Sequence, residues 1–256
     1  TIDGADSGSA LGITSFAGIE NLVGGSNLVD GSGVDRFIMR VGGSISGQIH
    51  GGAGDDMLIG PDANSTWSLT GDDAGTLNGS TDYIAIEHLT GGNAADVFQV
   101  QGSGTLSGLL DGGLDKAVVP GGPAAEDSLD FSLYGSTVNV DLALANATAI
   151  NAFSRIDVVA GSAVAGDTLT GPGVADDHIT WTVTGLDAGE VEGTAFSGFK
   201  NLAGRGASSD YFFFDALGSL SGLLNGGVGV GATDGFAVSD GALTQGYVDD
   251  LRGQTV

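Results

Sequence analysis

Internal repetition restricts the fold of this chain more than any other feature, because repeated units stack into an array instead of folding around one centre. An "aromatic phrase" reads FAGIENLVG at 16–24, YIAIEHLTG at 83–91, FSRIDVVAG at 153–161 and FSGFKNLAG at 196–204. A "serine phrase" reads SISGQIHGG at 44–52, TLSGLLDGG at 105–113 and SLSGLLNGG at 219–227. A "tryptophan phrase" reads STWSLTGDDAGTLNG at 65–79 and ITWTVTGLDAGEVEG at 179–193. A single unit of this length cannot bury its own apolar face, so neighbouring units must cover one another.

The three phrases keep a fixed order: tryptophan phrase, aromatic phrase, serine phrase. We therefore divide the chain into rounds of about 1–60, 61–120 and 175–230, with an inserted stretch at 121–174 and a divergent end at 231–256. Trp67 corresponds to Trp181, so the second and third rounds are offset by 114 residues. Residues 1–12 match the end of the tryptophan phrase, and we expect the chain to be one elongated segment of a longer repeat protein.

Glycine content and alternating apolar residues predict an all-β fold. The chain has 48 glycines among 256 residues and only 4 prolines, while 41% of its residues are apolar. This composition suits many short strands joined by tight turns, because glycine adopts positive φ without steric cost. Alternation is clear at 138–144 and 179–183, and it favours strand over helix even at 142–153. We predict a parallel β-solenoid, of the β-helix or β-roll type, built from degenerate glycine-rich repeats.

The aromatic phrase is expected to supply the core. Its spaced apolar residues, Phe16, Ile19 and Leu22 in the first copy, should point inward together with their three counterpart sets. Asn21 and Asn201 follow the same spacing, and we expect them in a buried polar ladder.

The charge of the chain excludes some partners and favours others. There are 32 acidic residues against 7 basic ones, which gives a net charge of −25. Nucleic acids and anionic membrane surfaces are therefore poor partners, whereas divalent cations are good ones. There is no cysteine, so disulfides and thiolate metal sites are excluded. No apolar run approaches the roughly 20 residues of a membrane span, so we expect none.

Two segments carry the residue types suited to a cation. GGAGDDMLI at 51–59 follows the pattern Gly-Gly-x-Gly-x-Asp-x-apolar-x at every defined position, and DGSGVDRFI at 30–38 follows it at all but the first. Glycines let backbone carbonyls face a cation, the aspartate adds charge, and the apolar residue anchors the next strand. We expect Asp35 and Asp56 to act as a pair.

These nonapeptides resemble the hemolysin-type (RTX) calcium-binding repeat, and the wider phrases resemble repeats of giant secreted bacterial adhesins. The resemblance is strict only at 30–38 and 51–59, because later copies such as the one at Asp96 keep little more than the Asp-x-apolar ending. It implies Ca²⁺ between the loops of successive coils and a bacterial protein that is extracellular or on the cell surface. The metal-binding residues that it implies are Asp30, Gly31, Gly33, Asp35, Gly51, Gly52, Gly54, Asp56 and Asp96.

Catalysis is not expected. Each histidine occupies a repeated position and has no catalytic partner near it in sequence: His50, His88 and His178. Asp73 recurs as Asp6 and Asp187, which indicates a turn aspartate bonded to its own backbone.

These patterns favour a structural or adhesive segment of a secreted or cell-surface bacterial protein, such as a stalk, filament or adhesin, stabilised by calcium. One alternative is a polysaccharide-binding module, or a non-catalytic part of a β-helical carbohydrate-active enzyme, with surface glycans as partners. Trp67 and Trp181 are expected in the core, but in exposed positions they would stack on sugars. Another alternative is a self-assembling filament or surface-layer subunit that binds copies of itself.

Overall fold

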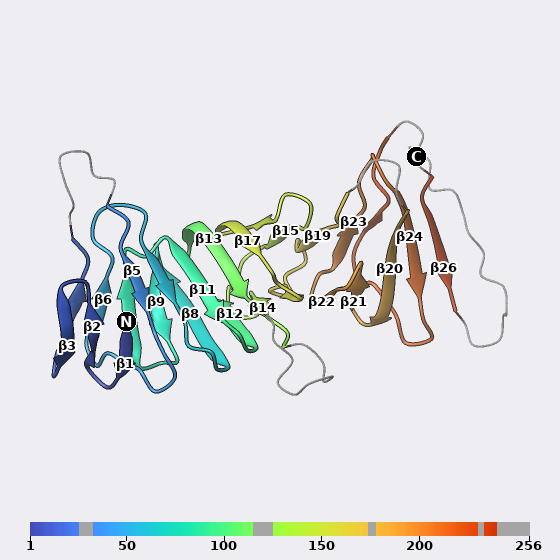
Figure 1. Cartoon of the computed structure of the whole chain (residues 1–256). Helices are drawn as coiled ribbons and strands as arrows, with labels where there is room; N and C mark the ends of the chain where they lie inside the picture. Colours follow the sequence, from blue (N-terminus) through green and yellow to red (C-terminus); the bar gives the residue numbers. More distant parts are fainter. Residues whose placement is uncertain (26–32, 115–124, 174–177, 230–232, 240–256) are drawn as a thin grey trace. The chain divides into compact units, whose positions relative to one another are not determined.

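The computed structural model describes residues 1–25, 33–114, 125–173, 178–229 and 233–239. Every regular element among them is a β-strand, as predicted (Figure 1). The chain forms two compact units, which we describe separately. The first unit contains residues 1–134 and 149–156, and the second contains 135–148 and the residues from 157 onward. No helix long and apolar enough to cross a membrane occurs in the described ranges.

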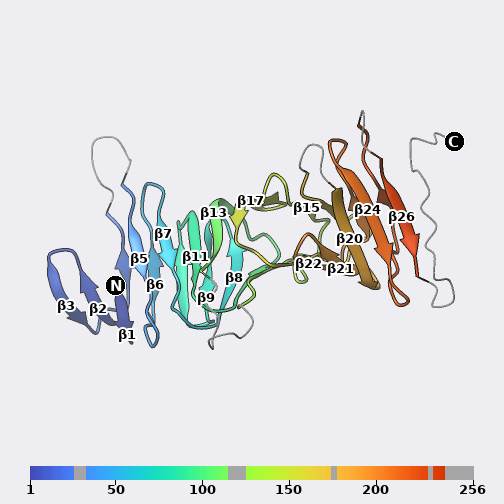
Figure 2. The same ribbon diagram turned by 45° about the vertical axis from the view of Figure 1, so that its right-hand side comes forward.

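The first unit contains a small antiparallel meander and two larger groups of paired strands. The meander consists of β1 (Ile2–Gly4), β2 (Ser7–Ala10) and β3 (Ile13–Ala17), which lie side by side in Figures 1 and 2. One group has the order β4 (Leu22–Val23), β6 (Gln48–His50), β10 (Thr81–Ile84), β9 (Ala74–Leu77), β8 (Ser65–Gly71), β12 (Asp96–Val100) and β14 (Ser128–Asp130). The other has the order β5 (Arg36–Ile38), β7 (Met57–Ile59), β11 (His88–Gly92), β13 (Leu106–Gly113) and β17 (Ile150–Ser154).

The chain alternates between these two groups as it advances. β4 lies in one group, β5 in the other, β6 in the first again, and β7 in the second. Strands from successive passes pair in parallel, as in β4–β6, β5–β7, β7–β11 and β8–β12. In the described part of the first unit, this path is interrupted at the meander β8–β9–β10, in which β9 is antiparallel to both of its neighbours. Residues far apart in sequence therefore stack at equivalent places.

The second unit has the same kind of pairing. One group has the order β18 (Val158–Ala160), β22 (Thr194–Ser197), β21 (Ala188–Val191), β20 (His178–Gly185), β24 (Ser209–Phe214) and β26 (Gly235–Val238). The other has the order β16 (Asn146–Ala147), β15 (Asn139–Asp141), β19 (Thr168–Thr170), β23 (Asn201–Ala203) and β25 (Leu224–Asn225). The meander β20–β21–β22 repeats β8–β9–β10, so the two copies of the tryptophan phrase have the same structure.

Both tryptophans lie in the core, as expected, and are fully buried. The Trp67 ring stacks on Phe98, with ring centroids 5.6 Å apart, and meets the edge of Tyr83 at 6.2 Å. The Trp181 ring repeats both contacts, because it stacks on Phe212 at 5.2 Å and meets the edge of Phe196 at 6.1 Å. Such aromatic pairs add stability beyond the area that they bury. Neither tryptophan is available to stack on a sugar.

The aromatic phrase supplies the core in its later copies but not in its first. Tyr83 and Ile86 are fully buried, and their counterparts in the last copy, Phe196 and Phe199, are buried as well. In the first copy, however, 42% of Ile19 is exposed and Phe16 is only half-buried. The difference arises because β10 and β22 have neighbours on both sides, whereas β3 pairs only with β2 among the described residues.

Two details of the sequence analysis are wrong. The alternation at 138–144 does not continue as a strand, because β15 ends at Asp141, whose Oδ1 accepts the N–H groups of Ala143 and Leu144 at 3.0 and 2.9 Å. The predicted polar ladder exists as separate hydrogen bonds and is not buried. Asn21 Oδ1 accepts a backbone N–H at 3.1 Å and Asn201 Oδ1 accepts one at 2.9 Å, but Asn21 is exposed and Asn201 is half-buried.

Candidate functional site

A corner made by a glycine and a following aspartate recurs in both units, and we call it the aspartate corner. In each corner the carboxylate lies against the glycine Cα. A Cβ on the glycine would come within 2.4–3.2 Å of an aspartate side-chain atom, which leaves little or no room for a side chain. The corners in the described residues are Gly24–Asp35, Gly51–Asp56, Gly91–Asp96, Gly112–Asp127, Gly161–Asp167, Gly204–Asp210 and Gly226–Asp234.

Four of the corner carboxylates, those of Asp56, Asp127, Asp167 and Asp234, also hold the chain segment that is stacked beside them. Asp56 Oδ1 accepts the backbone N–H of Asp35 at 2.7 Å, and Asp127 Oδ1 accepts that of Asp96 at 2.7 Å. The corresponding bonds of the second unit run from Val138 N–H to Asp167 at 2.8 Å and from Asp210 N–H to Asp234 at 3.0 Å. These charge-assisted bonds link segments that are 21–31 residues apart in sequence.

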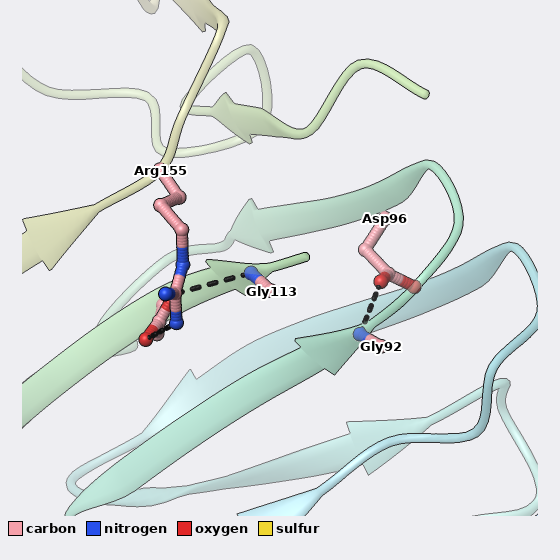
Figure 3. Close-up of polar contacts among 5 residues, drawn as sticks. Gly92, Asp96, Gly113 and Arg155 are labelled. Atoms are coloured by element: carbon pink, nitrogen blue, oxygen red, sulfur yellow. Dashed lines mark hydrogen bonds and ion pairs between the residues drawn. The ribbon is translucent and has the colours of Figure 1, made fainter. Parts of the chain in front are cut away.

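In some corners protein donors also satisfy the second carboxylate oxygen. Asp96 Oδ2 accepts the N–H of Gly92 at 2.8 Å, as Figure 3 shows. Asp210 Oδ2 accepts the N–H of Arg205 and the hydroxyl of Ser208, both at 3.0 Å. These carboxylates therefore find donors within the protein itself.

The first two corners differ in this respect. The Oδ2 atoms of Asp35 and Asp56 are buried and have no hydrogen-bond partner in the part of the chain that the structure describes. Asp56 is fully buried as a residue. A buried carboxylate oxygen without a donor is costly unless another positive group compensates it.

In the second unit, the pKa of one corner carboxylate, Asp210, is raised. Burial raises the pKa of Asp210 above its usual value, and the nearby Asp234 charge adds to the rise. Hydrogen bonds from Trp181, from the Arg205 backbone and from Ser208 act in the opposite direction. The Trp181 Nε1–H donates to Asp210 Oδ1 at 2.9 Å, so the core tryptophan and the corner are directly coupled.

The structure brings the predicted calcium pair together. Asp35 and Asp56 lie in neighbouring loops and share the hydrogen bond described above. Gly33 and Gly54 pack so closely that a Cβ on Gly54 would lie 1.6 Å from the Gly33 carbonyl oxygen. Gly54 has φ of +133° and Gly52 has φ of +111°, conformations that L side chains rarely adopt.

The remaining predicted ligands are placed differently. Gly51 faces the Asp56 carboxylate, whereas Asp96 belongs to a separate corner with Gly91 and Gly92. Asp30 and Gly31 lie outside the described residues. No group of three or more acidic or histidine side chains suited to a metal ion occurs in the described ranges. A calcium ion would therefore rely on Asp35 and Asp56 together with backbone carbonyls, and the two oxygens without donors fit that role.

A second acidic contact joins the tryptophan phrase to the serine phrase. Asp73 Oδ1 accepts the N–H of Ser107 at 2.7 Å, and Oδ2 accepts its hydroxyl at 2.8 Å. The same two bonds join Asp6 to Ser46 and Asp187 to Ser221. The prediction of a turn aspartate bonded to its own backbone is therefore wrong, because the acceptor serves a distant serine. All three aspartates do have positive φ, between 47° and 53°.

One histidine has a structural role that its position in the repeat explains. His88 Nδ1 accepts the N–H of Leu109 at 3.0 Å, as Asn21 and Asn201 do with their side-chain oxygens. The imidazole thus replaces an amide oxygen at the same place in the aromatic phrase. His50 Nδ1 is buried without a hydrogen-bond partner among the described residues.

Two arginines hold acidic side chains. Arg155 forms an ion pair with Asp111, which also accepts the N–H of Gly113 at 3.1 Å (Figure 3). Arg205 pairs with Asp141 in the second unit. These contacts use two of the seven basic residues to fasten loops, so they serve the structure.

An aromatic patch of exposed His178 and Phe213 and half-buried Tyr211 lies on β20 and β24 of the second unit, strands that lie side by side in both views (Figures 1 and 2). The rings of His178 and Tyr211 stack at 5.6 Å with an interplanar angle of 7°. Phe213 follows on the same face of β24 and is 45% exposed. The second round has Val97 and Gln99 in place of Tyr211 and Phe213, so the patch is specific to the third round.

Comparisons of the chain with protein-family models, with curated proteins and with solved structures found no match. The function must therefore be argued from the contacts themselves.

Proposed function

We propose that this chain is a structural segment of a repeat protein, a parallel β-solenoid that acts as a stalk or adhesive spacer. The observation that carries the proposal is the bond pair between Asp73 and Ser107, which two other rounds repeat. Each bond pair thus fastens the tryptophan phrase to the serine phrase of the same round. A chain whose repeated polar residues fasten successive stacked segments is suited to a stalk. Such a stalk resists mechanical load and sets the distance between a surface and the tip domain.

The residues that a hydrolase or lyase would need serve other contacts. His88 accepts a backbone N–H, and the corner aspartates accept backbone N–H groups of stacked segments. General acid–base catalysis needs titratable groups directed at an accessible substrate. Asp56, Asp96 and Asp210 are fully buried, which favours a structural role.

Calcium is part of the proposal, at the corners of Asp35 and Asp56, where the nonapeptide pattern is strict. Among the described residues their Oδ2 atoms have no donor, whereas the Oδ2 atoms of Asp96 and Asp210 have protein donors. A cation at the first two corners would compensate the buried charge and rigidify the loops. The acidic excess, together with the resemblance to RTX-like repeats, supports an extracellular or cell-surface setting in which calcium is plentiful.

A display experiment tests the spacer function. The chain is fused between a surface anchor and a tip domain of known ligand, and binding is measured on cells that carry a dense polymer layer. We expect the tip to bind its ligand when this chain separates it from the anchor. A flexible Gly/Ser linker of equal residue number should bind less, because a random coil samples a wide range of end-to-end distances, including short ones that leave the tip inside the polymer layer, whereas a folded solenoid holds one fixed distance. Equal binding with the two spacers would overturn the proposal.

The aromatic patch favours a second candidate, a polysaccharide-binding module. Tyr211, Phe213 and His178 lie together on one strand pair, and sugars stack on accessible aromatic rings. Binding to a panel of immobilised neutral and acidic polysaccharides tests this candidate. Tyr211→Ala and Phe213→Ala should abolish any binding, whereas Val97→Ala, at the matching place of the second round, should not change it.

A further inference from the structure

One outward-facing row of the second unit crosses three neighbouring strands. Thr182 of β20 lies opposite Glu190 of β21 on one side and opposite Phe213 of β24 on the other. Trp181 and Phe212, which precede Thr182 and Phe213, are fully buried, so the row points away from the core. We call Glu190, Thr182 and Phe213 the outer row. Each of the three strands has a paired strand on both sides, so the row lies on a face of the sheet and not at its edge.

The fold does not require the residues of the outer row. The second round forms the same meander and the same parallel pairing with Thr76, Ser68 and Gln99 at the three matching places. These polar residues suit an outward face, and the Gln99 amide donates to Asp130 at 3.2 Å. In the third round, by contrast, Phe213 is 45% exposed, and Tyr211 and His178 lie beside it. Exposed aromatic and apolar side chains that gather in one place mark a binding surface.

The outer row combines an aromatic ring with polar side chains on the next two strands. Residues directly opposite each other in a sheet are about 4.5–5.5 Å apart at Cβ, so Thr182 borders the Phe213 ring and Glu190 follows it. A sugar has the matching chemistry, because its ring C–H groups stack on an aromatic face while its hydroxyl groups form hydrogen bonds beside it. A purely apolar partner would instead bury the polar groups of Thr182 and Glu190 without hydrogen bonds, which is costly.

The charge of this face selects among polysaccharides. Glu190 is exposed, and the strands β20, β21, β24 and β26 contain no lysine or arginine. The whole chain has a net charge of −25. A polymer of sugar acids would therefore be repelled, whereas an ammonium group on a sugar would be attracted to Glu190. A second copy of this chain is disfavoured for the same reason, because it would bring its own negative charge to the face.

We propose that the outer row binds a polysaccharide with free amino groups, a polymer of unacetylated hexosamine. One sugar ring stacks on Phe213, a sugar ammonium group pairs with Glu190, and Thr182 forms a hydrogen bond to a sugar hydroxyl between them. Phe213 and Glu190 are two strand separations apart, about 9–10 Å, so the contact covers more than one sugar. The inference rests on the polysaccharide-binding candidate of the proposed function and gives the class of its ligand.

Isothermal titration calorimetry of the full chain tests the proposal with three oligosaccharides of equal length. One is a glucosamine oligomer, the second is its N-acetylated form, which is neutral, and the third is an oligogalacturonate, which is acidic. The glucosamine oligomer should bind most tightly. The N-acetylated form should bind about two- to five-fold more weakly, because an exposed ion pair contributes no more than that. The acidic oligomer should not bind.

Three variants separate the outer row from the general attraction of a cation to an acidic protein. Phe213→Gln introduces the residue that the second round has at the matching place, and it should weaken binding of both hexosamine oligomers by about tenfold or more. Glu190→Gln should erase the difference in affinity between these two oligomers. Asp82→Asn removes an exposed carboxylate of the first unit, and as the matched control it should keep the wild-type affinities.

Melting curves show whether each variant is folded, and Tyr211→Val, again the residue of the second round, replaces Phe213→Gln if that variant does not fold. No binding of the glucosamine oligomer, or equal weakening by Asp82→Asn and Glu190→Gln, would overturn the proposal. Self-association of the wild-type protein that Phe213→Gln abolishes in sedimentation velocity would also overturn it, because the face would then belong to a second copy. Binding through Phe213 with no preference for amino groups would overturn the ligand class and leave the polysaccharide-binding candidate standing. The display experiment tests the spacer function separately.

Discussion

Asp73 and Ser107 are joined by two hydrogen bonds although 34 residues separate them in sequence. The aspartate has φ of 48°, a conformation in which Asp is tolerated better than most residues. It therefore turns the chain and fastens the turn to the next segment. The serine phrase supplies both donors, one from the backbone and one from the side chain.

Asp73→Ala should lower the free energy of unfolding by about 1–3 kcal/mol, because it leaves the Ser107 donors without an acceptor and places Ala at positive φ. Asp73→Asn should cost less, since the amide oxygen still accepts the Ser107 N–H and Asn tolerates this φ. Urea unfolding measures both values. Asp82→Ala, at an exposed carboxylate on β10, should be close to neutral. Equal losses for the Asn and Ala variants of Asp73 would contradict this account.

The close packing in the aspartate corners predicts how far a glycine-to-alanine substitution lowers the stability of the protein. A Cβ on Gly91 would lie 2.0 Å from the Gly112 carbonyl oxygen and 2.4 Å from Asp96 Oδ2. Gly91→Ala should therefore destabilise the protein strongly, by about 3 kcal/mol or more, through overpacking. Gly102→Ala is the control, because Gly102 has φ of +55° but nothing within 4 Å of a Cβ. It should cost only about 1–2 kcal/mol of backbone strain.

Thermal or urea unfolding of both glycine variants decides between overpacking and strain. If Gly91→Ala loses no more stability than Gly102→Ala, the corner does not need glycine for space.

The raised pKa of Asp210 predicts how the stability of the protein depends on pH. Burial raises its pKa in the folded protein, so the folded state takes up this proton at a higher pH than the unfolded state does. The group therefore adds stability as the pH falls through the folded pKa, and this gain is complete below the ordinary carboxylate pKa of about 3.9. The stability of wild type relative to Asp210→Asn should rise as the pH is lowered from neutral.

Trp181→Phe should enlarge this pH effect, since it removes a hydrogen bond that lowers the Asp210 pKa. Melting temperatures of the three proteins across acid pH provide the readout. A difference between wild type and Asp210→Asn that falls on acidification would contradict the sign of the shift.

The sequence could predict those parts of the fold that depend on local spacing. The aromatic phrase placed Tyr83, Ile86 and Leu89 in the core, because their spacing is visible within nine residues. It failed for Ile19, because burial there depends on a neighbouring strand and not on the phrase itself. The strand predicted at 138–144 likewise extends too far. β15 ends at Asp141, because the Asp141 side chain accepts the N–H groups of Ala143 and Leu144.

The site was predictable only where the loop kept its consensus length. Gly51 and Asp56 are five residues apart, and the nonapeptide revealed them. Asp127 lies against Gly112 and Asp234 against Gly226, but these pairs are separated by longer loops that hide the equivalence. The serine partners of Asp73 and its counterparts were missed because hydrogen bonds between stacked segments leave no local signal. The constant distance between the two phrases in the second and third rounds was the one available clue.

Calcium removal tests the corners of Asp35 and Asp56, whose Oδ2 atoms have no donor in the part of the chain that the structure describes. Ca²⁺ should raise the melting temperature of the wild-type protein, and a chelator should lower it again. Asp56→Asn keeps an acceptor for the Asp35 N–H but loses the charge, so it should lose the calcium response. Asp96→Asn is the matched control and should keep the response, because Gly92 already satisfies the Oδ2 atom of Asp96. A wild-type melting curve that calcium does not change would contradict the predicted site.

The central claim is that the rounds of this chain are interchangeable stacked units, and a deletion tests it most directly. Removing residues 69–182 joins Ser68 to Val183 and keeps the 114-residue register, so that Val183 takes the buried place of Leu69. Removing residues 69–183 is the control, because it places the polar Thr184 there. We predict that the first variant keeps its β circular dichroism and melts cooperatively, while the control melts at a much lower temperature. An in-register variant that fails to fold, or two variants of equal stability, would contradict the claim.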